Sequence, residues 1–174
     1  MDIKTERLIL REFNDKDYKF FKKLEQNEFY IKYERDSIPT EEETREKFEG
    51  ILEKNNSKDN YRFLITRAED GEPLGTVLVW CIDKPIREWE IGWGLSQEHT
   101  GKGIATEAAR ALLKFGFDKL NAHRIQANCN ANNIASEKIM ERIGMKKEGT
   151  LRDTRILRGE WFGSTIYSIL ENEI

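Results

Sequence analysis

The chain has 174 residues, enough for one domain with a buried core, and no repeat, low-complexity tract or linker divides it. We therefore expect residues 1–174 to form a single domain. Hydrophobic residues make up 38% and charged residues 35% of the sequence, which is typical of a soluble globular protein with a charged surface. The formal net charge of −3 argues against a nucleic-acid-binding module, because such modules usually carry a basic excess.

Neither a membrane anchor nor a metal site is indicated. No stretch approaches the roughly 20 apolar residues of a membrane-spanning helix, and the first residues lack the apolar run of a signal peptide, so we expect a cytoplasmic protein. Cys81 and Cys129 form no spaced framework and should be free thiols in a reducing compartment. His99 and His123 have no carboxylate or cysteine at metal-ligand spacing. We interpret both histidines as surface or capping residues.

The first segments predict a strand followed by charged, amphipathic helices. Residues 7–13 alternate as a strand does, and Asn14 can then cap a helix that has acidic residues in its first turn. A capping-box pattern at 40–43 starts a second helix that reaches about Lys54, where the polar residues 55–60 end it. Aromatic residues gather in this region, and most of them should be core: Tyr18, Phe20, Phe21, Phe29, Tyr30 and Tyr33.

The middle of the chain predicts strands. Residues 61–68 and 74–82 are apolar runs joined by a turn with an Asp-Gly pair, which is a good hairpin signal. Residues 87–96 have the clearest period of two along the chain. One face of this strand carries Trp89, Ile91, Trp93 and Leu95, and the other carries Glu90, Gly92, Gly94 and Ser96.

The last part of the chain mixes helices and strands. We expect a helix at 103–120, a strand at 124–130, a helix at 133–143 and strands at 145–158 and 161–170. Gly144 suits the left-handed position that follows a helix end. The order is mixed α/β and not a strict βαβ alternation.

The stretch from Glu90 to Ala108 is a strand, a loop and a helix, with Gly101 and Gly103 in the loop. Glycine lets the backbone come close to a ligand. The first turn of a helix presents unpaired N–H groups with a partial positive charge. The stretch therefore predicts an anion site made of backbone, with phosphate as its natural occupant.

The loop has three alternative interpretations besides the anion site. A Walker P-loop needs a glycine at position 96 and a Ser or Thr after the lysine, where this chain has Ser96 and Gly103. A dinucleotide fingerprint needs a third glycine at position 106 and an acid at the end of the next strand, where the chain has Thr106 and Asn128. A glycine-rich turn that only packs a helix on a sheet is the structural alternative.

Further motifs along the chain favour the anion site over the purely structural alternative. The loop, with Asn133-Ile134-Ala135-Ser136 and Glu141-Arg142-Ile143-Gly144-Met145, resembles the GNAT superfamily of acetyltransferases, and most closely its branch of ribosomal-protein N-terminal acetyltransferases. The opening 5–11 and Gly159-Glu160-Trp161 leading into Tyr167 also resemble that branch. The resemblance covers essentially the whole chain. It implies an α/β (α+β) GNAT fold, with a mixed, mostly antiparallel central sheet splayed between two strands and flanked by about four helices.

The resemblance also implies acetyl-CoA as the cofactor. The family's phosphate loop, Q/R-x-x-G-x-G/A, falls on 100–105. Thr100 stands where Gln or Arg is usual, so we expect weaker side-chain contact but no loss of the site, because backbone N–H groups supply most of the binding. The pantetheine arm is expected to pair like an added strand around Leu95. The implied cofactor-binding residues are Leu95, Thr100, Gly101, Lys102, Gly103, Ile104, Ala105, Thr106 and Asn133.

The implied reaction is direct attack of a neutral primary amine on the acetyl thioester. An α-amino group has a pKa of about 7.7–8.0, against about 10.4 for lysine, so it is partly neutral near pH 7. The leaving thiol has a pKa of about 8.5, so a general acid is useful but not obligatory. That matters here, because many GNAT enzymes carry a tyrosine general acid at the position of Met140.

Ser136 and Glu90 are the candidate catalytic residues. Ser136 matches a serine that the ribosomal-protein branch uses near the departing sulfur; alternatively, it only satisfies backbone groups in a first helical turn. Glu90 is the candidate base, acting through water, and its alternative is a carboxylate paired with a cross-strand Arg or Lys. Arg155, near an acidic position of some relatives, and Gly163, where an aspartate is common, depart from the pattern. These departures leave the base and the acceptor contacts open.

The resemblance favours a protein or peptide N-terminal amine as the acceptor. The same branch is widely used for antibiotics, polyamines and amino acids, so a small-molecule amine is the alternative. A non-catalytic acyl-CoA-binding sensor on the same scaffold is the alternative of another class. We expect no nucleic-acid or membrane partner, and either a monomer or a homodimer.

Overall fold

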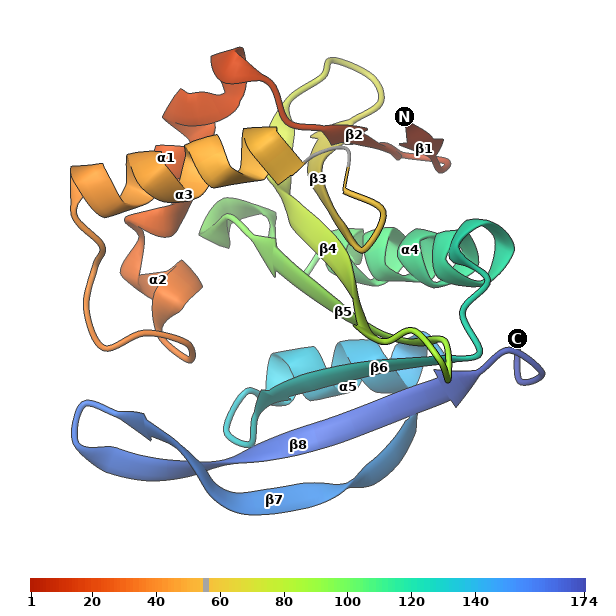
Figure 1. Ribbon diagram of the computed structural model, residues 1–174. Coiled ribbons are helices and arrows are strands. Elements are labelled where there is room, and N and C mark those ends of the chain that lie inside the picture. The colour runs from red at the N-terminus through yellow and green to blue at the C-terminus, as the bar shows by residue number, and fades with distance from the viewer. Residues whose placement is uncertain (55–56) are drawn as a thin grey trace.

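The computed structural model of the protein describes residues 1–54 and 57–174, and its centre is one eight-stranded sheet (Figure 1). The strands lie in the order β1-β2-β3-β4-β5-β6-β8-β7, and every neighbouring pair is antiparallel except β5 with β6. Their bounds are β1 Ile3–Lys4, β2 Leu8–Glu12, β3 Asn60–Arg67, β4 Pro73–Asp83, β5 Glu88–Leu95, β6 Arg124–Asn130, β7 Lys146–Leu157 and β8 Glu160–Leu170. The predicted mixed, mostly antiparallel sheet is therefore confirmed.

Within residues 1–54 and 57–174, five α-helices accompany the sheet, where about four were expected. They are α1 Tyr18–Glu25, α2 Glu28–Ile31, α3 Glu41–Lys54, α4 Ile104–Leu120 and α5 Ile134–Arg142. Two turns of 3-10 helix, η1 at Asp15–Asp17 and η2 at Gln97–His99, precede α1 and α4. Among the helices that the structure describes, none has both the length and the apolar character needed to cross a bilayer.

The helices cover both faces of the sheet, and side chains of β3 show which helix covers which face. Phe63 and Ile65 belong to the large core beneath α4, while Leu64 between them packs with Phe21 and Phe48 of α1 and α3. Successive side chains of a strand point to opposite faces. α4 and α5, which contact each other, therefore lie on one face, and α1 and α3 lie on the other.

The capping residues predicted for the first helices are confirmed. The side chain of Asn14 accepts a hydrogen bond from the Lys16 backbone N–H, at the start of the η1 turn that leads into α1. Thr40 and Glu43 form the capping box of α3, with Glu43 Oε2 2.8 Å from the Thr40 nitrogen. The short β1 and α2 were not predicted. Of the polar residues expected to end α3, Asn55 and Asn56 lie outside the described residues.

The sheet divides between β5 and β6. These parallel strands are paired only at Glu88 with Arg124, Trp89 with Ile125 and Glu90 with Gln126. Beyond that junction β5 stays paired with β4 as far as Leu95, whereas β6 follows the antiparallel β8. The two strands diverge in Figure 1, so the predicted splay is confirmed. We call the space between residues 91–95 of β5 and the β6–β8 half of the sheet the cleft.

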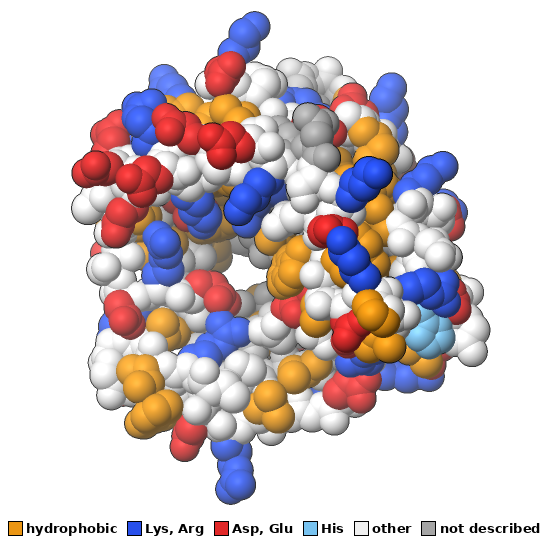
Figure 2. All heavy atoms as spheres, viewed as in Figure 1, with side chains coloured by type: hydrophobic (Ala, Val, Ile, Leu, Met, Phe, Trp, Pro, Cys, Tyr) orange, Lys and Arg blue, Asp and Glu red, His pale blue; other side chains and the backbone are white. Residues whose placement is uncertain are grey.

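The open end of the cleft is bridged by contacts between segments far apart in sequence. Arg158, in the turn between β7 and β8, donates side-chain hydrogen bonds to the backbone oxygens of Lys32 at 2.9 Å and Arg35 at 3.3 Å. The Arg158 backbone N–H donates to Asp36 Oδ1 at 2.7 Å. The β7–β8 hairpin is thereby held against the loop that follows α2. Figure 2 shows the molecule hollowed at its centre, with acidic and basic side chains around the hollow.

Candidate active site

The loop between η2 and α4 presents backbone to its surroundings. Gly101 and Gly103 have φ angles of 74° and 77°, in the left-handed region that favours glycine. Gly103 is the N-cap of α4 and offers no side-chain oxygen to the first turn, and a Cβ added at Gly101 would meet nothing within 4 Å. The first N–H groups of α4 have no partner within the helix. These groups lie at the positive end of a 17-residue helix, where an anion would be stabilised.

The N-terminal segment holds this loop in place. Arg7 donates from Nε to Glu107 Oε2 at 2.7 Å and from Nη1 to the Lys102 carbonyl at 3.2 Å. Thr5 Oγ1 donates to the other oxygen of Glu107 at 2.6 Å. Thr5 and Arg7 are therefore tied to the first turn of α4 across about a hundred residues of sequence. A pocket of about 360 Å³ lies beside the loop and is lined in part by Arg7, Lys102 and Ile104.

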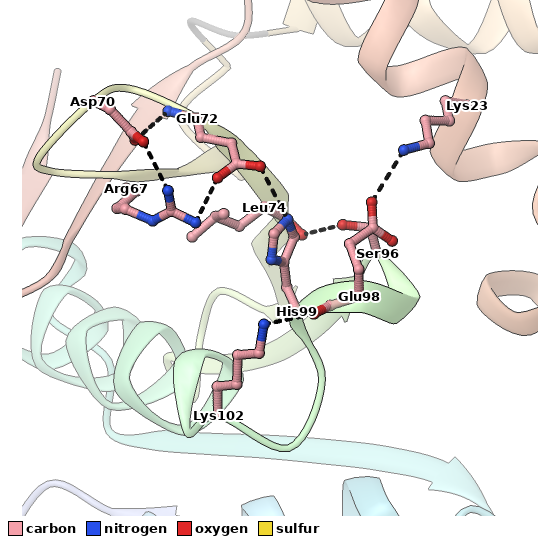
Figure 3. Close-up of polar contacts among 9 residues, drawn as sticks. All are labelled: Lys23, Arg67, Asp70, Glu72, Leu74, Ser96, Glu98, His99 and Lys102. Carbon is pink, nitrogen blue, oxygen red and sulfur yellow. Dashed lines mark hydrogen bonds and ion pairs between the residues drawn. The ribbon is translucent and has the colours of Figure 1, made fainter.

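The turn between β5 and the loop is fixed by the hairpin that starts β4 (Figure 3). Ser96 Oγ donates to the Leu74 carbonyl at 3.0 Å, and Lys102 Nζ donates to the Glu98 carbonyl at 2.8 Å. His99 Nε2 lies 3.6 Å from a carboxylate oxygen of Glu72, and only 7% of the residue is exposed. The prediction that His99 is a surface or capping residue is therefore wrong. Its ring fills the space between the turn and the hairpin.

The strand edge that lines the cleft can receive an added extended chain. Beyond Glu90, no described strand pairs with the cleft edge of β5, which ends at the buried Leu95. Two buried side-chain donors on the strands beside the cleft, Trp93 Nε1 and Asn130 Nδ2, have no hydrogen-bond partner among the described residues. Buried N–H groups are almost always satisfied. The unpaired edge of β5 and the glycine loop fit a cofactor with a long amide-containing arm and a pyrophosphate.

Glu90 lies at the last paired position before β5 and β6 separate, and it is 9% exposed. Its Oε2 accepts a hydrogen bond from Gln126 Nε2 at 2.9 Å, and its Oε1 accepts one from Asn128 Nδ2. Burial raises the pKa of the Glu90 carboxyl above its ordinary value; the hydrogen bond from Gln126, the charge of Arg155 and the hydrogen bond from Asn128 offset part of this rise. The partners of Glu90 are amides, so the alternative of a direct cross-strand ion pair is wrong.

Arg155 connects this carboxylate to the bridged end of the cleft. It donates from Nη2 to Asn128 Oδ1 at 2.7 Å, from Nη1 to Glu34 Oε2 at 2.8 Å and from Nε to Ser164 Oγ at 3.0 Å. The sequence marks Arg155 only as a departure from a family pattern, and it gives Asn128 and Glu34 no role in the site. No spacing could have shown these partners, because 121 residues separate Glu34 from Arg155.

Comparison with known proteins identifies the scaffold. The acetyltransferase (GNAT) domain family matches residues 7–146, most of the chain. The chain belongs to the GNAT acetyltransferases. A GNAT-family acetyltransferase from Bacillus anthracis is similar in structure, with a TM-score of 0.87 and 32% sequence identity over 99% of this chain and 100% of that one. GNAT enzymes use acetyl-CoA, and the unpaired edge of β5 and the glycine loop fit it. The protein is an acetyl-CoA-dependent N-acetyltransferase.

Two relatives have named acceptors of different chemistry. The Escherichia coli [ribosomal protein uS5]-alanine N-acetyltransferase is 32% identical over 71 residues, which cover 41% of this chain and 37% of that protein. The E. coli spermidine N(1)-acetyltransferase is 28% identical over 104 residues, which cover 60% of this chain and 56% of that protein. Similarity alone therefore does not choose between a protein and a polyamine.

The helix after β6 supplies the remaining predicted residues of this GNAT site. Asn133 caps α5, and its side-chain oxygen accepts a hydrogen bond from the Ser136 N–H at 3.2 Å. The half-buried Ser136 hydroxyl is not engaged by any described residue. Met140, at the position of the tyrosine acid of other GNAT enzymes, is completely buried. Only Ser136 is thus placed in the open first turn of α5 with a proton to donate.

Ser136 and Glu90 belong to opposite ends of the cleft. Glu90 is opposite Gln126, near the start of β6, and Ser136 follows the end of that strand. The four residue steps from Gln126 to Asn130 alone span about 13 Å of extended chain. Among the described residues, no contact joins the two candidate catalytic side chains. Their separation means that, if both act in catalysis, they cannot act on the same atom.

Gly163 has a structural reason for departing from the family pattern. A Cβ at this position would lie 2.5 Å from the Leu151 carbonyl oxygen of the neighbouring strand. The register of β7 against β8 shifts between Leu151 and Arg155, which brings the two backbones close together. An aspartate at position 163 would clash there, so this chain cannot use one.

Cys81 and Cys129 are both free, as predicted. Cys129 is 3% exposed, and burial raises the pKa of its thiol to about 11. Within the described part of the chain, no group of three or more His, Cys, Asp and Glu side chains is placed to hold a metal ion.

Proposed function

We propose that this GNAT enzyme acetylates the α-amine at the N-terminus of a protein or peptide. The observation that carries the proposal is the position of Glu90. Its carboxylate is buried at the junction where the cleft opens, both its oxygens are hydrogen-bonded by amides, and its pKa is raised. A carboxylate with a raised pKa is a better proton acceptor than an ordinary surface glutamate.

When bound, acetyl-CoA supplies an acetyl group activated as a thioester. Glu90 accepts, through one water molecule, the proton that the ammonium group of the acceptor loses. The freed nitrogen lone pair forms the C–N bond as the C–S bond breaks, and the nitrogen then loses its second proton to water. Ser136 then donates a proton to the departing sulfur and regains one from water. Each turnover thus releases the amide product, CoA and one proton.

The charges around the cleft favour a single amine over a polyamine. The Glu34 carboxylate is paired with Arg155, whereas the Asp36 carboxylate accepts only the neutral backbone N–H of Arg158 and so keeps its single negative charge. A polyamine with several positive charges is best held by several unpaired carboxylates, whereas an α-amine needs only one proton acceptor. A pocket of about 330 Å³ lined by these acids, Ile156 and Leu157 offers room for the residues that follow the amine.

The two alternatives, a small-molecule acceptor and a non-catalytic sensor, differ in what they require of Glu90. A small-molecule amine such as spermidine would use the same base and the same cofactor site. A sensor that only binds acyl-CoA would leave Glu90 without a function. We infer that residues 1–174 act as a single-domain cytoplasmic enzyme, monomeric or homodimeric; the continuous eight-stranded sheet supports the single domain.

The test combines ligand binding with acceptor screening. Thermal stabilisation by acetyl-CoA and CoA, but not by ATP or NAD, is expected first. Thiol release is then measured with N-terminal peptides, with the same peptides blocked at the α-amine but carrying a lysine, and with spermidine. We expect release with free N-terminal peptides only. Faster release with spermidine would establish the small-molecule alternative, and binding without release from any amine would favour the sensor.

A further inference from the structure

We propose that Arg155 and Asn128 are positioning residues for the base, because Arg155 fixes the Asn128 amide so that each oxygen of Glu90 receives a hydrogen bond. This inference rests on the proposed function of Glu90. It gives a role to Arg155, which the sequence shows only as a departure from the family pattern.

The orientation of the Asn128 amide follows from the chemistry of its two neighbours. An arginine side chain has only donors, and an ionised carboxylate has only acceptors. With Arg155 Nη2 at 2.7 Å, the Asn128 oxygen must face the guanidinium and its NH₂ group must face Glu90. The reverse orientation would place donor against donor and oxygen against oxygen. Arg155 therefore selects one amide orientation out of two.

Arg155 can fix the Asn128 amide because hydrogen bonds to other residues hold its own guanidinium in place. Its side chain is 22% exposed, and Glu34 and Ser164 accept its Nη1 and Nε protons. Ser164 Oγ also lies 2.6 Å from Thr154 Oγ1, so this acceptor is positioned in turn. Three directed donors are needed for the three partners. Lysine keeps the charge but not this planar, forked geometry.

The charged and polar groups that face Glu90 come from three strands. Gln126 and Asn128 donate to it from β6, Arg155 contributes positive charge from β7, and Glu88 contributes negative charge from its own strand. Removing Arg155 takes away the nearby positive charge and frees the Asn128 amide to turn its oxygen toward the carboxylate. Both changes disfavour the ionised form, so the pKa of Glu90 must rise further.

The direct test is a carbon-13 NMR titration of the Glu90 side-chain carboxyl, assigned with Glu90→Gln. We expect a higher pKa in Arg155→Met and in Asn128→Leu than in the wild type. Arg152→Met is the matched control, because it removes the same charge from an exposed side chain of the same strand and should leave the titration unchanged. Equal Glu90 titrations in wild type, Arg155→Met and Asn128→Leu would overturn the proposal.

Kinetics give a second readout that a purely structural role would not produce. In Arg155→Met the acidic limb of the kcat/KM profile should move to higher pH. The loss at low pH should be about tenfold, the scale of a lost hydrogen bond to a charged group, and should recover at high pH. Arg155→Lys, which is the milder change to the fold, should move the limb in the same direction by less. An unshifted limb in both variants would overturn the proposal.

The two proposals fail in different ways. If Glu90→Gln leaves the acidic limb intact, Glu90 is not the base and the proposed function of that residue fails. If Glu90→Gln abolishes the limb while Arg155→Met leaves it in place, only the positioning role fails. Retained acetyl-CoA affinity in each variant shows that the protein is folded for the comparison.

Discussion

The two sides of the cleft, which we call the cofactor wall and the acceptor wall, present different chemical groups: backbone N–H groups on the first and side chains on the second. On the cofactor side, the glycine loop and the start of α4 present backbone N–H groups, and the only side chains required are those that hold the loop, such as Arg7 and Glu107. On the acceptor side, the functional groups are side chains from β5, β6, β7 and the loop after α2. A backbone site tolerates any side chain that leaves it open. A side-chain network depends on every member.

This difference predicts how each wall responds to substitution. If backbone N–H groups bind the phosphate, recognition should survive the presence of Thr100, since a side chain contributes little to it. The acceptor wall changes whenever one polar partner changes, as at Arg155. The largest effects are therefore expected where the backbone cradle is filled, and graded effects where single side chains are altered.

Gly103→Glu should have the largest effect, because it fills the cradle. A carboxylate is itself stabilised at a helix N-terminus and would compete with pyrophosphate there. We expect acetyl-CoA affinity to fall by about a hundredfold or more, measured by calorimetry, on the scale of a few kcal/mol for lost charge-assisted hydrogen bonds. Gly71→Glu is the matched control, with the same φ of 77° in the β3–β4 turn, where an added Cβ meets nothing within 4 Å. Retained affinity in a folded Gly103→Glu protein would refute the phosphate-loop assignment.

Glu90→Gln is expected to come next, because it removes the proton acceptor while keeping the shape. Loss of a general base lowers kcat/KM by about 10²–10⁴-fold. Acetyl-CoA affinity, measured by thermal stabilisation, should stay the same. A glutamine variant with wild-type kcat/KM would mean that water alone deprotonates the acceptor.

Ser136→Ala should lower kcat moderately, about tenfold or less, because the thiol is a good leaving group and needs little help. Steady-state kinetics with saturating peptide checks this, and acetyl-CoA affinity should not change. Unchanged kcat would return Ser136 to the role of a first-turn residue of α5.

Arg158→Met should act on the acceptor side only, because it removes the side-chain hydrogen bonds to Lys32 and Arg35. We expect the KM for the peptide to rise by up to about tenfold, as for one or two net hydrogen bonds, with kcat and acetyl-CoA affinity little affected. A rise in the KM for acetyl-CoA instead would show that the bridge serves the cofactor side.

The smallest effect is expected for alkylation of Cys129. With the pKa of its thiol raised to about 11, roughly one thiol in a thousand is ionised at pH 8, and the side chain is buried. Alkylation of the folded protein with iodoacetamide at pH 8, read by mass spectrometry, should leave Cys129 unmodified. The thiolate fraction grows as the pH rises toward 11, and unfolding should make Cys129 react at once. Rapid modification in the folded state would mean that the cleft exposes this thiol.

The sequence predicted the fold well, because local patterns carry it, whereas the cofactor-binding residues stay a prediction. Alternation in residues 87–96, the capping box at Thr40 and the glycines of the loop each determine structure within a few residues of themselves. The short α2 was missed because four residues carry too little periodicity. His99 was misassigned because its burial depends on Glu72, which no local pattern reveals.

The acceptor wall could not be predicted from single positions. Glu34, Glu90, Asn128 and Arg155 come together only after the sheet has formed and its hairpins have folded. Glu90 was found because it shares the strand that leads to the glycine loop. Its partners lie on other elements, and an asparagine or an arginine alone carries no signal of such a contact. The need for glycine at position 163 likewise comes from a neighbouring strand, because the carbonyl of Leu151 leaves no room for a side chain.

The bridge at Arg158 has a consequence for how an acceptor travels. The cleft is joined at one end by the β5–β6 junction and at the other by the contacts of Arg158 with Lys32, Arg35 and Asp36. A polymer cannot be laid sideways into a ring; it has to be threaded by its tip. If the acceptor is a protein, as proposed above, a loop in the middle of a folded domain would be excluded because it has no free end, and only the end of a chain would reach the cleft.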